Sequence, residues 1–204
     1  MPLPDRDFDV TEVAVPWKLA TDAGHEVVIA TEDGATPGAD PRLLAGVLFG
    51  KLGAADEAKQ FYDELTRDPS FARPARWRDV AIEDVDALIL AGGHAPGMKQ
   101  YLGSAALHAQ VAAFWATGRP VGAICHGVLA LARAKDAAGA SVIAGSTTTC
   151  LPKYMERSAY LLTFWKLGRY YRTFPAYVED GRYVSARWPG DAYKVARAFV
   201  ARLG

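Results

Sequence analysis

The sequence contains only two cysteines and four histidines among its 204 residues. Two cysteines do not make a disulfide framework, and their scarcity favours a reducing, cytoplasmic compartment. The histidines, His25, His94, His108 and His126, have no spacing typical of a zinc site. From the sequence we therefore expect no metal ion and no other cofactor.

An excess of one charge and long apolar runs are also missing. The 23 basic side chains balance the 23 acidic ones, which argues against a nucleic-acid-binding face or an acidic tail. No apolar stretch approaches the length of a membrane span, and the first residues do not resemble a signal peptide. We expect neither a nucleic acid nor a membrane as partner.

What is present is a chain of which half the residues are hydrophobic, long enough for one α/β domain over residues 1–204. Strands are expected over 1–4, 26–31, 85–90, 120–124 and 141–144, and helices over 12–23, 105–117, 127–132, 151–166 and 191–203. Asp9 or Thr11 can cap the first helix, and Ser104 the second. Asp180-Gly181 marks the turn of a hairpin over 177–184. This alternation predicts a flavodoxin-like, doubly wound fold, with a mostly parallel sheet between helices.

Residues from about 37 to 77 interrupt the alternation of strands and helices. Three prolines separate short segments that are expected to be helical, such as the one over 54–65. We interpret the stretch as a helical insertion packed over the sheet edge near the site, and not as a second domain.

Residues 120–132 carry the strongest functional pattern. A short apolar run typical of a buried strand breaks at Cys125-His126-Gly127, and an alanine-rich run of helical type follows. A strand that turns sharply into a helix places the turn residue where open α/β folds bind ligands. The helix N-terminus also favours a thiolate. Cys125 is therefore interpreted as a nucleophile with His126 beside it; the alternative is a buried cysteine that acts as a small hydrophobe.

Gly92-Gly93-His94 follows the strand expected before the elbow. Backbone N–H groups of Gly93 and His126 could line an oxyanion hole beside the Cys125 sulfur. The alternative is an ordinary turn at a strand end. We place Gly92, His94 and Trp77 at the substrate pocket, with His94 more a hydrogen-bond partner of the loop than a catalyst.

Two glutamates are candidates for acid–base roles. Glu12 lies on the first turn after the first strand, at the sheet edge that also carries Cys125. Burial would raise its pKa so that it can hold or relay a proton; the alternative is a helix-end carboxylate favoured by the dipole. Glu156 could orient His126 in a Cys-His-Glu arrangement, or it is a solvated helix residue.

Three motifs, which stand in the family's order along the chain, resemble the ThiJ/PfpI family, which has the class I glutamine-amidotransferase-like fold. They are Ala123-Ile124-Cys125-His126-Gly127, Ala91-Gly92-Gly93-His94 and Thr11-Glu12-Val13-Ala14-Val15-Pro16. The resemblance covers nearly the whole chain. It implies that Cys125 is the nucleophile, Glu12 the glutamate next to it, His126 the histidine after the cysteine and Gly93 the oxyanion-loop glycine.

The insertion and the pair Pro152 and Glu156 are similar to the heat-shock glyoxalase III branch of that family. This resemblance implies that Glu156 completes a triad, although Lys153 stands where some relatives place their acid. The sequence departs from the branch in a first strand that looks clipped at Met1. A second departure is a shorter segment between Thr173 and Tyr177 than the branch often has.

The resemblance implies a glutathione-independent glyoxalase that converts a small 2-oxoaldehyde such as methylglyoxal to a hydroxy acid such as lactate, without a cofactor. Two alternatives stay open: a cysteine amidase or peptidase, and a stress chaperone or redox sensor. An amidotransferase would carry a late triad histidine, whereas no histidine follows His126. A homodimer is expected from base rates alone.

Overall fold

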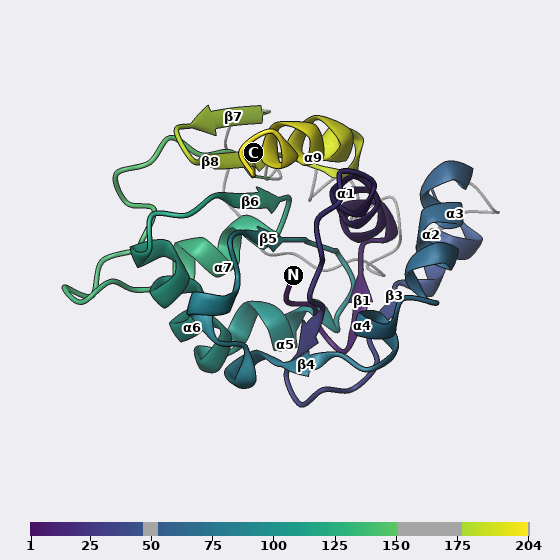
Figure 1. Ribbon diagram of the computed structural model, residues 1–204, viewed down its shortest axis with the longest axis horizontal. Coiled ribbons are helices and arrows are strands. Elements are labelled where there is room, and N and C mark those ends of the chain that lie inside the picture. Colours follow the sequence, from purple (N-terminus) through teal and green to yellow (C-terminus); the bar gives the residue numbers. More distant parts are fainter. Residues whose placement is uncertain (47–52, 151–176, 204) are drawn as a thin grey trace.

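The computed structural model describes residues 1–46, 53–150 and 177–203. Its largest sheet has the strand order β5-β6-β8-β7. These strands are β5 (Leu88–Leu90), β6 (Val121–Ile124), β7 (Tyr177–Asp180) and β8 (Tyr183–Ala186). β5, β6 and β8 run parallel, and β7 pairs antiparallel with β8 (Figure 1). The predicted mostly parallel α/β fold is confirmed.

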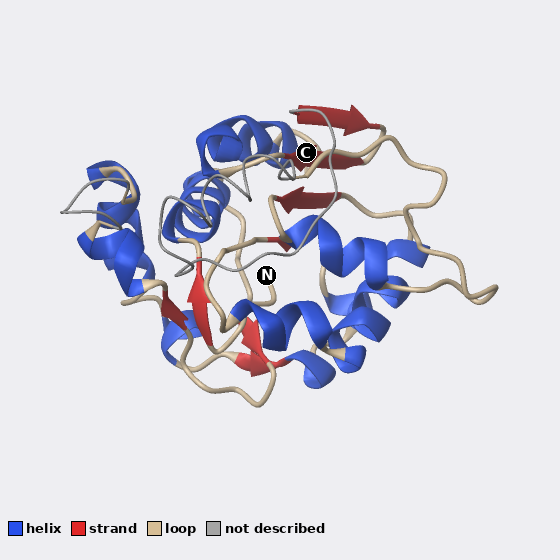
Figure 2. Cartoon of the chain, turned by 180° about the vertical axis from the view of Figure 1, so that it is seen from behind, coloured by secondary structure: helices blue, strands red, loops and turns tan. Residues whose placement is uncertain are grey.

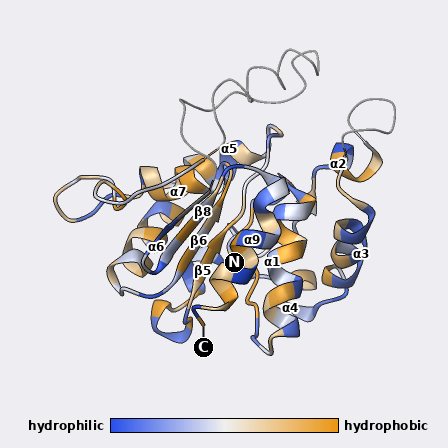
Figure 3. Ribbon diagram, turned by 90° about the horizontal axis from the view of Figure 1, so that it is seen from above, coloured by the Kyte–Doolittle hydropathy of each residue, from blue (hydrophilic) through white to orange (hydrophobic). Residues whose placement is uncertain are grey.

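Helices cover both faces of this sheet. On one face α9 (Ala192–Val200) packs against β6 and β8, and α1 (Val10–Asp22) packs against α9. On the other face α7 (Gly127–Arg133) contacts β5 and β6, with α6 (Ala105–Ala116) beside it. Figure 3 shows the sheet standing between these two helical layers. The predicted sandwich of helices around a sheet is confirmed.

The apolar core lies in two clusters, one on each side of the sheet. The cluster toward α6 and α7 includes Phe114 and Leu131, and the cluster toward α9 includes Ile124, Val184 and Phe199. Each such side chain contributes about 1.5–3 kcal/mol when it is fully buried. Both layers therefore hold β6 in place, and with it the residue that follows Ile124.

The N-terminal part of the chain forms two short parallel pairs, β1 (Arg6–Phe8) with β3 (Gly38–Ala39), and β2 (Ala30–Thr31) with β4 (Ala75–Arg76) (Figure 2). The expected strand over 26–31 is wrong in length, because the N–H of Ile29 donates to the Ser70 hydroxyl instead of a strand. The expected strand over 1–4 is reduced to a single bridge between Pro2 and Ala30.

The insertion contains α2 (Pro41–Ala45), α3 (Asp56–Leu65), α4 (Pro69–Ala72) and the two short strands β3 and β4. α3 packs against α1, and Ala58 of α3 belongs to the same buried cluster as Cys125. This places the helical part of the insertion beside the elements that carry the site. The two short strands were not predicted, because two-residue strands show no periodicity.

Two caps appear where the sequence predicts them. Asp9 Oδ1 accepts hydrogen bonds from the N–H groups of Thr11 and Glu12, and Ser104 Oγ accepts one from Leu107. Such caps stabilise a helix end by about 1 kcal/mol. The Asp9 cap fixes the first turn of α1, and therefore the place from which Glu12 leaves the helix.

Two local expectations are wrong. Residues 141–144 form no strand: Ser141 makes one bridge with Lys135, and a turn follows in which Ile143 is buried. The hairpin is present, but its turn is Gly181-Arg182, one residue later than expected, with Gly181 at φ +58°. The expected helix over 151–166 lies outside the described residues.

The remaining elements are short. α5 (Met98–Gly103) precedes α6, and single turns of 3₁₀ helix occur at Trp77–Asp79, Ile82–Asp84 and Pro189–Asp191. Among the described residues, no helix has both the length and the apolar character that crossing a bilayer requires.

Candidate active site

Cys125 occupies a sharp turn between β6 and α7. Its φ is +52°, in the left-handed region that residues other than glycine adopt rarely, at a cost of about 1–3 kcal/mol. The neighbouring strand holds the turn, because the N–H of Cys125 donates to the Ala186 carbonyl at 2.8 Å. The predicted strand–turn–helix elbow is therefore present, and backbone strain is concentrated at the candidate nucleophile.

Gly92 permits a close approach of three elements at this turn. A Cβ atom on Gly92 would lie 2.7 Å from the His126 nitrogen and 2.8 Å from Glu12 Oε2. The Gly92 carbonyl accepts the N–H of Asp9 at 2.9 Å. Only glycine fits here, so the loop after β5, the start of α1 and the elbow form one tightly packed unit.

Gly93 lies equally close to the chain before α1, since a Cβ atom there would be 2.7 Å from the Asp7 carbonyl oxygen. The His126 N–H is hydrogen-bonded to the Cys125 sulfur. The assignment of Gly93 and His126 as oxyanion donors stays a prediction.

Glu12 is the acid beside Cys125. Its side chain is fully buried, and Oε2 accepts the N–H of Gly92 at 2.7 Å. Burial raises the pKa of Glu12 well above its ordinary value, and the negative charge of Asp9 raises it further. Glu12 therefore holds its proton to a higher pH than an ordinary glutamate does, and its carboxyl group hydrogen-bonds the Cys125 side chain.

The thiol of Cys125 differs from the expected thiolate. Burial raises the pKa of Cys125 well above its ordinary value, and the charges of Glu12 and Asp9 act in the same direction, whereas the His126 N–H lowers it. The hydrogen bond between the Cys125 and Glu12 side chains also raises the pKa of Cys125. Burial is then the main cause, and the resting cysteine is a thiol that must be deprotonated when substrate binds.

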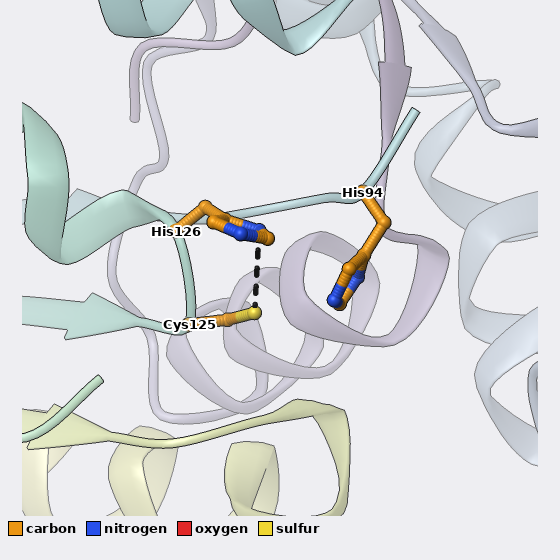
Figure 4. Close-up of side chains that lie close together, drawn as sticks. All are labelled: His94, Cys125 and His126. Atoms are coloured by element: carbon orange, nitrogen blue, oxygen red, sulfur yellow. Dashed lines mark hydrogen bonds between the residues drawn. The ribbon is translucent and has the colours of Figure 1, made fainter. Parts of the chain in front are cut away.

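Two imidazoles lie beside the sulfur. His126 Nδ1 is 3.7 Å from Cys125 Sγ, and the His94 ring stands edge-on to the His126 ring with centroids 4.6 Å apart (Figure 4). Burial lowers the pKa of His94 to about 3, and His126 lowers it further. His94 is therefore neutral at physiological pH, and His126 Nδ1 is close enough to hydrogen-bond the thiol.

One ligand atom each of His94, Cys125 and His126 lies within 4.8 Å of the other two. Two imidazoles and a thiol are ligands that zinc and related soft ions accept. The spacing of the four histidines in the sequence gave no indication of this arrangement. The fold creates it by bringing the loop after β5 beside the elbow.

The structure does not place every predicted residue at this site. Trp77 is buried elsewhere: its indole N–H donates to the Ala30 carbonyl at 3.0 Å, and its ring contacts Tyr101 edge-on. It lines a small apolar cavity of about 60 Å³ to which neither Cys125 nor His94 contributes. Trp77 is therefore a core residue, and its assignment to the substrate pocket is wrong.

Glu156, the predicted third triad member, lies outside the described residues. Gly92 and His94 do lie at the site, and Glu12, Cys125 and His126 are all fully buried. His94 is half-buried, and it is the residue of this group that solvent reaches.

Asp9 is the site residue whose role sequence reasoning missed. It was expected only as a helix cap, yet burial raises its pKa to about 6, and its charge acts on both Glu12 and Cys125. Asp40 lies beyond it, buried and paired with Arg42 at 2.9 Å, and raises the Asp9 pKa further. The sequence signal that could have indicated this role is the spacing, because Asp9 stands three residues before Glu12.

The sequence is similar to that of a known family and of several known proteins. The family described as "ThiJ/PfpI family-like" matches residues 3–195. An uncharacterized protein of Schizosaccharomyces pombe is 30% identical over 198 residues, which cover 91% of this chain and 71% of that protein. A deglycase of Pyrococcus abyssi is 28% identical over 196 residues, which cover 96% of this chain and 93% of the deglycase.

A solved structure has the same fold. Glyoxalase III from Candida albicans matches with a TM-score of 0.70 and 20% identity, covering 96% of this chain and 88% of that chain. At this identity the likeness shows the fold alone.

Proposed function

The chain belongs to the ThiJ/PfpI family, and from that premise we propose that it is a glutathione-independent glyoxalase-type enzyme. It converts small 2-oxoaldehydes such as methylglyoxal to 2-hydroxy acids such as lactate. One observation carries the proposal: a cysteine on a strained elbow has an imidazole nitrogen 3.7 Å from its sulfur and a buried carboxyl group of raised pKa hydrogen-bonded to its side chain. These are the groups that an internal proton transfer requires.

The first step forms a carbon–sulfur bond. His126 Nδ1 accepts the thiol proton, and the Cys125 sulfur attacks the aldehyde carbon of the substrate. The imidazolium then returns the proton to the new alkoxide, which gives a hemithioacetal. No net charge develops in the buried site across this step, which suits a sulfur whose pKa burial raises.

The second step moves hydrogen between adjacent carbons. His126 removes the proton from the carbon bonded to sulfur, while the Glu12 carboxylic acid protonates the neighbouring carbonyl oxygen to give an enediol. His126 then protonates the second carbon, and Glu12 recovers a proton from the hydroxyl group on the first. The product is a thioester of the 2-hydroxy acid, and both side chains regain their starting protonation states.

Water ends the cycle by hydrolysing the thioester, which releases the hydroxy acid and restores the Cys125 thiol. The N–H groups of Gly93 and His126 stabilise the oxygen anion in this step, each by about 3 kcal/mol where such donors have been removed in other enzymes. Oxidation of the aldehyde carbon balances reduction of the ketone carbon. No redox partner is therefore consumed.

Glu156 is proposed to orient the His126 ring and keep one tautomer ready for the thiol proton. Glu156→Ala should then slow both alkylation of Cys125 and turnover, whereas Lys153→Ala should change neither. Unchanged alkylation in the Glu156→Ala protein would remove Glu156 from the mechanism and leave the roles of Cys125 and Glu12 intact.

A second candidate function uses the same first adduct. Curated relatives from Pyrococcus and Thermococcus, 26–28% identical over almost the whole chain, are named deglycases. A deglycase would act on the adduct of a 2-oxoaldehyde with an amine or thiol instead of the free aldehyde. The Cys125 sulfur would displace the amine or thiol at the same carbon.

The deciding experiment supplies methylglyoxal to the purified protein without added thiol and measures lactate. Wild-type protein should form lactate, Cys125→Ser should form none, and the matched control Cys150→Ala should retain activity. Pre-formed adducts of N-acetyllysine are then tested at fixed free methylglyoxal. A rate that follows the adduct concentration supports the deglycase, and a rate that follows the free aldehyde supports the glyoxalase.

Lactate formation by Cys125→Ser at the wild-type rate, or none by the wild type with either substrate, would contradict the proposal. In the latter case the hydrolase and the chaperone or redox-sensor alternatives remain to be assayed.

A further inference from the structure

The side chains of His94, Cys125 and His126 converge on one space at the elbow (Figure 4). One ligand atom of each lies within 4.8 Å of the other two. We propose that these three residues form a binding site for a thiophilic divalent cation, of which zinc is the best fit, and that the bound ion reversibly caps the nucleophile.

The distances suit zinc with little rearrangement. A tetrahedral zinc ion with a sulfur at about 2.3 Å and a nitrogen at about 2.0 Å holds those two atoms about 3.5 Å apart. Cys125 Sγ and His126 Nδ1 are 3.7 Å apart. The third atom, from His94, already lies within 4.8 Å of both, so a small ring movement on the loop completes three ligands.

The chemistry of the ligand set selects the ion. Thiolate and imidazole favour zinc and copper(I), whereas magnesium and calcium prefer oxygen. The imidazole rings of His94 and His126 each offer a nitrogen lone pair to such an ion. The Cys125 thiol releases its proton to solvent when the sulfur–metal bond forms.

Access and coordination number indicate an exchangeable site. Cys125 and His126 are fully buried, but His94 is half-buried and provides the entrance. Three protein ligands leave a fourth position for water, the pattern of zinc sites that are not purely structural. A bound ion occupies the sulfur lone pair that attacks the substrate, so that turnover stops until the ion leaves.

Cobalt(II) is the probe for this site, because a thiolate–cobalt bond gives a charge-transfer band that other ligands do not. Chelator-treated wild-type protein should bind one equivalent with this band, and zinc should displace it. Cys125→Ser should abolish the band, and Cys150→Ala should keep it. His94→Asn and His126→Asn should each weaken binding by at least about 10-fold, while the matched control His25→Asn should bind as the wild type does.

A second readout uses the wild-type protein alone, in case a variant fails to fold. Zinc should slow alkylation of Cys125, measured by mass spectrometry of peptides, and leave alkylation of Cys150 unchanged. A charge-transfer band in folded Cys125→Ser, its loss in folded Cys150→Ala, or wild-type affinity in His94→Asn would overturn the proposal. So would the absence of both the band and the protection in wild-type protein.

Only the inhibitory consequence rests on the proposed function. Lactate formation is measured in chelator-treated protein, and cobalt binding without substrate. Binding without lactate would retain the metal site and reject the glyoxalase, and lactate without binding would do the reverse.

Discussion

The two cysteines of this chain are almost equally buried, with 0% of Cys125 and 3% of Cys150 exposed, yet their surroundings differ. Cys125 follows a central strand in a left-handed conformation, hydrogen-bonded to a buried glutamate and next to a histidine. Cys150 belongs to the apolar cluster on the other side of the sheet, together with Tyr183. Burial alone therefore does not separate a nucleophile from a packing residue; groups that can move a proton do.

The largest expected difference is between a substitution of Cys125 and a substitution of Cys150. Cys125→Ser should reduce lactate formation by about 10⁴-fold or more, because a catalytic group that bonds the substrate has no substitute. Cys150→Ala should stay within about twofold of wild type and lose about 1 kcal/mol of stability, the cost of a small core deletion. Steady-state rates and urea unfolding measure both. Equal loss of activity in the two variants would end the distinction between the cysteines.

The next effect tests the buried acid beside Cys125. Glu12→Gln should keep the hydrogen bond with Gly92 and lose about 10²–10⁴-fold in turnover, because an amide cannot give up and recover a proton. The matched control is Glu64→Gln, an exposed glutamate that pairs with Lys18 on α1 and should have little effect. Wild-type turnover in Glu12→Gln would reduce Glu12 to a structural residue.

Asp9 provides a test based on pH. Its pKa is about 6 in the folded protein and 3.8 ordinarily, so the folded state binds the proton more tightly than the unfolded state. Asp9 therefore has no effect on the free energy of unfolding below its ordinary pKa of 3.8. That free energy falls as the pH rises from about 4 to 6, and above pH 6 the loss is complete. The shift corresponds to roughly 3 kcal/mol.

Asp9→Asn retains an oxygen that can cap α1 and removes the charge. Relative to wild type, the variant should gain stability between pH 4 and pH 7, and the pKa of Cys125 should fall, since Asp9 raises it. Unfolding in urea and alkylation rates across pH measure these changes. Asp68→Asn, at the cap of α4, is the control that should alter neither. An alkylation profile of Cys150 that moves as much as that of Cys125 would show a general effect on folding.

The sequence was sufficient for features that local chemistry decides. Asp9 and Ser104 cap helices where their side chains can reach free N–H groups, and the glycines around Cys125 mark an elbow that no bulkier residues fit. The proximity of Cys125, His126 and Glu12 follows from those elements and from the family motifs, and the roles assigned to them stay predictions. In each case the pattern that carries the prediction lies within a few residues of the chain.

What was missed depends on contacts between distant segments. Residues 141–144 look like a strand, yet among the described residues they pair with no neighbour beyond one bridge at Ser141. Trp77 ends the insertion and was placed at the pocket, but its partners Ala30 and Tyr101 hold it in the core. The raised pKa of Cys125 likewise depends on how completely three elements exclude water, which the elbow motif alone does not determine.

The smallest expected effect lies on the Cys150 side of the comparison. The Thr149 N–H donates to Ser185 Oγ at 3.1 Å, which fixes the residue before Cys150 to β8. Ser185→Ala leaves that buried N–H without its partner, so it should cost about 1–2 kcal/mol and speed alkylation of Cys150 through local opening. Ser70→Ala, which removes the partner of the Ile29 N–H, should lower the free energy of unfolding by a similar amount without changing the alkylation of Cys150.

The alkylation rate of Cys125 should be the same in both variants, because its elbow is held by Ala186 and Gly92 and not by this hydrogen bond. A faster reaction of Cys125 in Ser185→Ala would mean that the two cysteines share one opening unit and that their difference is not local.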